Sequence, residues 1–164
     1  MSEHPEHVKV AIAIADRLAA DQYDWSRVRF DSHAYPWFGR FLAEMATMIG
    51  PVAIEYVSSN FEFKESGIEF VAAVFTRDLF VISRGSGPTA APKFRTSTVA
   101  RKTLVEVQSR GGADVFSQDW PGALEVGVVF ERGEAVSLPL GGGGRSRSAV
   151  LEKFVPSLLA DLSG

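Results

Sequence analysis

Basic residues gather in one stretch of a chain whose net charge is −3. Between residues 84 and 110 the chain has a single acid, Glu106, against Arg84, Lys93, Arg95, Arg101, Lys102 and Arg110. If the fold brings these side chains together with Arg145 and Arg147, they would form a local patch that attracts an acidic partner or a phosphate. They could instead be solvated charges on turns and edge strands, which discourage sheets from associating.

Other residue groupings do not predict catalysis. The chain has no cysteine, which excludes disulfides, thiolate nucleophiles and Cys-ligated zinc. His4 and His7 have no third ligand nearby, and no sequence partner marks His33 as a general base. The glycine run 141–144 before Arg145 could present amides to an anion or simply allow a turn. We therefore predict a non-enzymatic protein that needs no metal and no cofactor.

Composition and charge limit the classes of partner and the cellular compartment that we expect for the chain. A pI of about 5.6 argues against a nucleic-acid-binding protein. No apolar run approaches the roughly 20 residues that span a membrane, so we expect no integral membrane segment. Glu3 and Glu6 precede the first apolar stretch and Asp16 interrupts it, which is not the pattern of a signal peptide. The lack of cysteine fits a reducing compartment, and we expect a cytoplasmic protein.

A hairpin pattern lies in the centre of the chain. The runs 68–75 and 79–84 are rich in β-branched and aromatic residues and flank the polar residues 76–78, as in a tight antiparallel hairpin. Both faces of the first run are apolar, so we expect this strand to be covered on both sides. Glycine and proline in 85–92 predict a mobile loop. Alternating patterns predict further strands at 52–58, 60–64, 94–100, 104–108, 124–130 and 135–140.

Apolar residues spaced three and four apart predict helices at 5–20, 36–49 and 146–162. The connection 23–37 is dense in aromatic residues, which could fill a seam between packed layers or line a ligand pocket. In the last helix we expect Pro156 to cause a kink. There we also expect one buried stripe: Val150, Phe154, Leu158 and Leu162.

From residue 52 onward the order of elements resembles the bacterial pleckstrin-homology-like (PH-like) domains. The resemblance is carried by the hairpin 74–82, the segment 99–107, the strand pair 126–140 with its turn at Gly133, and the helix core 151–159. It implies an α+β fold, a bent antiparallel β-sandwich or barrel capped by the C-terminal helix. Residues 1–50 would form a helical pair packed on the barrel or on a second copy of the chain. Residues 51–164 would form the barrel and its helix, the whole being one structural unit.

The resemblance also implies binding rather than catalysis. Members of the family bind peptides, partner proteins or phosphorylated lipid headgroups. We therefore expect a module that binds a protein or an acidic peptide, a second copy of itself included. The alternative is an anionic ligand or lipid headgroup held by the basic stretch 84–110. The loop 58–60, which would match the headgroup-binding loop of the family, has no basic residue.

Overall fold

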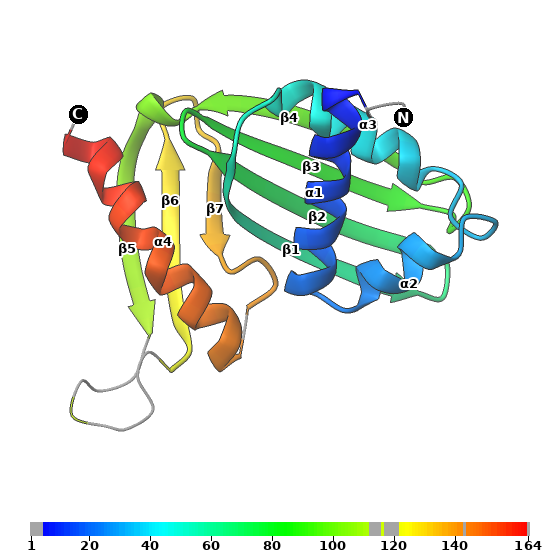
Figure 1. Ribbon diagram of the computed structural model, residues 1–164. Coiled ribbons are helices and arrows are strands. Elements are labelled where there is room, and N and C mark those ends of the chain that lie inside the picture. The colour runs from blue at the N-terminus through cyan, green and yellow to red at the C-terminus, as the bar shows by residue number, and fades with distance from the viewer. Residues whose placement is uncertain (1–4, 112–115, 117–121, 143, 164) are drawn as a thin grey trace. The chain divides into compact units, whose positions relative to one another are not determined.

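The computed structural model describes residues 5–111, 116, 122–142 and 144–163 (Figure 1). The fold is of the α+β class, as predicted, with helices and two antiparallel sheets. The chain divides into two compact units, Met1–Thr98 and Val99–Gly164, called here the N-terminal and C-terminal units. The sequence analysis instead placed a boundary at residue 51, between the helical pair and the predicted barrel.

Three helices begin the N-terminal unit: α1 (Glu6–Asp21), α2 (Asp24–Phe30) and α3 (Phe38–Ile49). The first and third match the predicted helices closely. The second was not predicted, because a seven-residue helix has only about two turns, whereas helical periodicity is recognised over windows of about 11–18 residues. It lies within the aromatic connection that was expected to be a loop. Gly50 ends α3 with a φ of 74°, as a glycine at that position can.

The sheet of this unit has the order β1-β2-β3-β4. Its strands are β1 (Ile54–Lys64), β2 (Gly67–Thr76), β3 (Leu79–Gly87) and β4 (Lys93–Ala100). The predicted central hairpin is confirmed, with Phe75 opposite Phe80 across its turn. The predicted break at residues 58–60 is wrong, because β1 runs through it and pairs with β2 along its length.

The helices cover one face of this sheet (Figure 1). Trp25 of α2 lies at the centre of the core and is fully buried. Its ring centroid is 5.6 Å from that of Phe41 on α3, 4.8 Å from that of Phe61 on β1 and 5.6 Å from that of Phe70 on β2. The aromatic connection therefore fills a seam between helices and sheet, the first of its two predicted roles.

Strand β2 is buried on both faces, as its apolar pattern predicted. Phe70, Ala72 and Val74 belong to the core beneath the helices. On the other face Ala73 and Phe75 are also fully buried, and Phe75 stacks on Phe80 with ring centroids 4.6 Å apart.

The segment 85–92 packs more than its composition predicted. Its first residues continue β3, and Gly85 lies so close to Phe70 that a Cβ atom there would be 2.3 Å from the ring. The indole of Trp37 donates a hydrogen bond of 3.0 Å to the carbonyl of Thr89. Pro92 is buried. Part of the segment that was predicted to be a mobile loop therefore packs against the rest of the unit.

The C-terminal unit contains a second antiparallel sheet and the last helix. A single 3-10 turn, η1 (Arg101–Thr103), leads into the first strand of this sheet. The strands are β5 (Leu104–Gly111), β6 (Leu124–Phe130) and β7 (Ala135–Leu138), and they pair in the order β5-β6-β7. Helix α4 (Arg145–Ser163) packs on β5, β6 and η1 and continues through Pro156.

The predicted stripe of α4 is only partly buried. Phe154 and Leu158 are buried, but Val150 is 53% exposed and Leu162 is 43% exposed. The apolar stripe is wider than the surface that the helix buries, so its outer members face solvent.

The strands form two separate sheets, of four and three strands, and not a closed barrel. Of the predicted sandwich or barrel, the closed barrel is therefore wrong. The antiparallel pairing within each sheet and the C-terminal helix are as expected.

Candidate functional site

One edge of the four-stranded sheet is capped by side chains at the C-terminal end of α1, from its last residue Asp21 and the next residue Gln22. The carboxylate of Asp21 accepts hydrogen bonds from the backbone N–H of Ser59 (2.8 Å) and from its hydroxyl (2.6 Å). The side-chain amide of Gln22 accepts from the N–H of Phe61 (2.7 Å) and donates to its carbonyl (2.8 Å). These bonds occupy backbone groups of β1 that would otherwise be open to another strand.

The opposite edge, β4, has no such cap. Within the described part of the chain no strand lies along the outer side of β4. Among the described residues, Ala100 is the one β4 residue whose backbone makes a hydrogen bond to a group outside the sheet. Its carbonyl accepts a hydrogen bond from the Thr103 hydroxyl (2.7 Å). An edge of this kind presents N–H and C=O groups to an added strand.

Basic side chains lie on one face of this edge. Phe94 packs against the core under the helices, and Thr96 bonds Ser83 through the two hydroxyls at 3.1 Å. Because successive side chains of a strand point to opposite faces, Lys93 and Arg95 lie on the face away from the helices, and both are exposed. The inward packing of Phe94, which lies between these two residues, agrees with the prediction that they share a face.

A hollow of about 350 Å³ joins Lys93 to Arg84 of β3. Ser86 and Glu69 also line it. The carboxylate of Glu69 lies 2.5 Å from the ammonium of Lys64, and this hydrogen bond raises the pKa of Lys64 above its ordinary value. Lys64 also lies 3.8 Å from Glu62, so this lysine is shared between two carboxylates, while Arg84 and Lys93 bring two cations to the lining of the hollow. We call Arg84, Lys93 and Arg95 the basic face of the sheet.

Arg101 is not a surface residue, contrary to prediction. It is 2% exposed, and its Nε donates to the carboxylate of Asp161 at 2.7 Å. Its Nη2 donates to the carbonyl (3.0 Å) and hydroxyl (2.9 Å) of Ser157, and the guanidinium lies 5.4 Å from the ring centroid of Phe154. Its neighbour Lys102 is exposed. Arg101 therefore holds α4 and is not available to a partner.

The remaining predicted residues begin α4. Arg145 is exposed, and Arg147 is half-buried and donates to the carbonyl of Gly142. They belong to the C-terminal unit with Arg101 and Lys102, whereas Arg84, Lys93 and Arg95 belong to the N-terminal unit. Of the predicted glycine run, residue 143 lies outside the described residues. The structure thus brings together three of the predicted site residues, those of the basic face.

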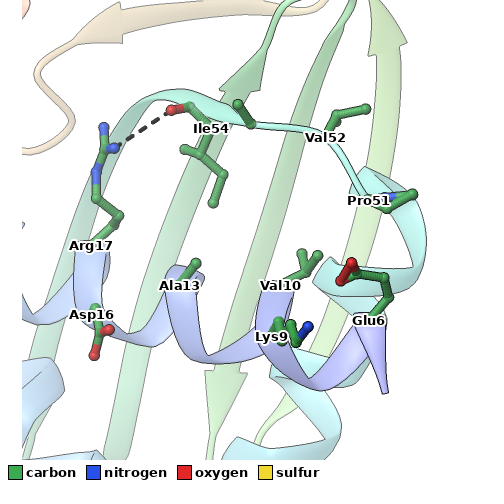
Figure 2. Close-up of a pocket in the computed structure, with 10 residues that line it drawn as sticks. Glu6, Lys9, Val10, Ala13, Asp16, Arg17, Pro51, Val52 and Ile54 are labelled. Atoms are coloured by element: carbon green, nitrogen blue, oxygen red, sulfur yellow. Dashed lines mark hydrogen bonds between the residues drawn. The ribbon is translucent and has the colours of Figure 1, made fainter. Parts of the chain in front are cut away.

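A second concave site was not predicted. It is a groove of about 480 Å³ between α1 and the segment 51–54 that leads into β1 (Figure 2). We call it the α1 groove. Its lining is apolar in the middle and charged at the rim: Val10, Ala13, Pro51, Val52, Ala53 and Ile54, with Glu6, Lys9, Asp16 and Arg17. The sequence offered one sign of it, since Val10 lies beside the main apolar stripe of the helix.

Over the residues that the structure describes, no group of three His, Asp or Glu side chains is placed to hold a metal ion. His7 and His33 are exposed, and His4 lies outside the described residues. None of the described helices is both long and apolar enough to cross a membrane. Comparison with protein-family models, curated proteins and solved structures gives no match.

Proposed function

We propose that the protein is a non-enzymatic binding module that takes up an acidic, extended segment of a partner protein along β4. The observation that carries this proposal is the pairing of an uncapped sheet edge with the basic face. The PH-like resemblance supports the same class of function, since it implies binding to peptides and partner proteins. The cysteine-free composition supports a partner in the cytoplasm.

An added strand would meet both features at once. Its backbone would pair with the outer groups of β4, about 4.8 Å away, and this pairing would supply the main contacts. Acids at every second position would lie on one face, beside Lys93 and Arg95. Exposed ion pairs are worth only about 0.2–1 kcal/mol each, so we expect modest affinity and strong dependence on salt.

The test is a fluorescence anisotropy titration with a labelled nine-residue peptide of alternating Glu and Thr. We expect it to bind at low salt, and we expect a peptide of alternating Lys and Thr not to bind. Replacing Arg84, Lys93 and Arg95 together with Gln should weaken binding at least tenfold. Folding should be little affected, because surface substitutions usually change stability by about 0.5 kcal/mol or less.

The matched control removes three positive charges elsewhere. Arg77, Arg132 and Lys153 are exposed and lie outside the basic face, and all three are replaced with Gln. We expect this variant to bind the acidic peptide within about twofold of wild type after allowance for the changed net charge. If it loses as much affinity as the basic-face variant, the attraction is non-specific and the proposal fails.

The hollow between Arg84 and Lys93 favours a second candidate, a small anion or lipid headgroup. Sedimentation with vesicles of phosphatidylserine and phosphatidylcholine at two salt concentrations tests it. Binding to these vesicles that the basic-face variant loses, without binding to the acidic peptide, would favour the headgroup over the protein segment.

A further inference from the structure

We infer that the α1 groove is a binding site for a small aliphatic carboxylate, with the carboxylate at Arg17 and the hydrocarbon along the groove floor. This site is distinct from β4 and from the basic face, and it does not depend on the proposed function. Its volume of about 480 Å³ lies within the range of small-molecule sites.

The middle of the groove suits a hydrocarbon. Figure 2 shows Val10 and Ala13 projecting from α1 toward the side chain of Ile54 on the opposite wall. Pro51 and Val52 extend that wall. No charged group separates these side chains, so an apolar body would displace water from apolar surface on both walls.

The charges at the rim do not cancel. The carboxylate of Asp16 is already bound to Arg29 at 2.6 Å. Glu6 lies in the first turn of α1, where the helix dipole stabilises a negative charge. Within the described residues, neither Lys9 nor Arg17 has a carboxylate within ion-pair distance. With Asp16 matched by Arg29, the rim carries two cations against one anion, so a single negative charge would bring it to neutrality.

Arg17 is placed to receive that charge. Its guanidinium is half-buried at one end of the groove and donates to the carbonyls of Ile54 (3.5 Å) and Glu55 (3.4 Å). Both contacts are long, and both acceptors are neutral. A guanidinium has five N–H donors, and a carboxylate can accept two of them in parallel, which is the stronger geometry. The carbonyl contacts would orient the group without satisfying its charge.

The experiment is a ¹H–¹⁵N NMR titration of the full chain with octanoate, and with 1-octanol as the uncharged analogue of equal chain length. We expect saturable shifts of the amides of Val10, Ala13 and Ile54 with octanoate, at a Kd on the order of 0.1–1 mM for a ligand of this size. We expect 1-octanol to bind at least tenfold more weakly.

Two substitutions test the position of the ligand. Ala13 and Ala20 are both exposed on α1, and only Ala13 lines the groove. Ala13→Phe should fill the groove and weaken octanoate binding at least tenfold, whereas Ala20→Phe should change it less than twofold. Arg17→Gln should weaken octanoate binding at least fivefold and leave 1-octanol unchanged. If Arg17→Gln does not fold, Ala13→Phe and the alcohol still decide the question.

Several results would overturn the inference. Octanoate shifts that do not saturate, or that map to another surface, would show that the groove is not a site. Equal affinity for the acid and the alcohol would show an apolar surface without a carboxylate site. Unchanged octanoate binding by Ala13→Phe would place the ligand outside the groove.

Discussion

A buried ion pair anchors the helix of the C-terminal unit. Arg101 reaches α4 and satisfies its donors with the carboxylate of Asp161 and two oxygens of Ser157. Taking a guanidinium out of water is costly unless it is paired, and here a carboxylate and two further hydrogen-bond acceptors offset that cost. The structural role of Arg101 is therefore to fix the position of α4 in the C-terminal unit.

We expect Arg101→Ala to lower the free energy of unfolding by about 3–5 kcal/mol, because it leaves the mostly buried Asp161 without its partner. Lys102→Ala, at the next position, should change it by about 0.5 kcal/mol or less. Urea denaturation of the two variants beside wild type measures both. Similar midpoints for the two variants would contradict the structural role of Arg101.

At the level of residues the sequence predicted some contacts and missed others for a clear reason. Alternation along a strand is a local property, so the shared face of Lys93 and Arg95 could be predicted. The partner of Arg101 is Asp161, which is 60 residues away along the chain. No local period reports such a pairing, and a lone arginine at a strand end is indistinguishable from a solvated one.

Helix α1 makes the two edges of the four-stranded sheet different. Helix α1 closes the β1 edge with Asp21 and Gln22, so the sheet has one closed edge and one available edge. In the function that we propose, this asymmetry would direct an added strand to β4. It could not be predicted from the sequence, where Asp21 and Gln22 are simply polar residues at a helix end.

Replacing Asp21 and Gln22 together with Ala should open the β1 edge. We expect hydrogen exchange at the amides of Ser59 and Phe61 to become at least tenfold faster, because both lose their acceptors. The amide of Asn60 points toward β2 and serves as the internal control. If all three amides accelerate equally, the substitutions have loosened the whole strand. The helix would then not be a specific cap.

Elements were predicted best where the segment that carries the apolar period is long. Helices α1 and α3, each of three turns or more, and the central hairpin were predicted from pattern alone. Helix α2 was missed because it is short, and β1 was divided in two because Ser58, Ser59 and Asn60 resemble a turn. Ser58 and Ser59 are in fact buried. Asp21 and the Trp25 indole bond the Ser59 hydroxyl, so a tertiary contact overrides the local preference.

For the whole molecule, the class of fold was predictable but the grouping of strands was not. Antiparallel pairing follows from short strands joined by turns. Whether seven such strands close into a barrel or form two sheets depends on which edges meet. The alternating pattern is the same in both cases. The PH-like resemblance left a sandwich and a barrel open, and the structure has two sheets and no closed barrel.

The helices α1, α2 and α3 complete the core of the N-terminal unit. A chain that begins at residue 51 would expose the helix-facing side of its sheet, including the now buried Phe61, Phe70 and Val74. Large exposed apolar patches favour association, so we expect this chain to aggregate or to melt well below the full protein. Light scattering and a thermal melt measure the two effects. A monomer with an unchanged Tm would contradict the packing described here.

If a partner segment adds to β4 as a strand, as we propose, backbone methylation of the acidic peptide should distinguish the two sets of its amides. In one peptide the amides of the Glu residues are N-methylated, and in the other those of the Thr residues. Only one of these two sets can face β4 in a paired strand, because amides alternate in direction. We predict that one methylated peptide loses at least tenfold in affinity and that the other stays within about threefold of the parent. Equal affinities for the two, whether retained or lost, would contradict strand addition.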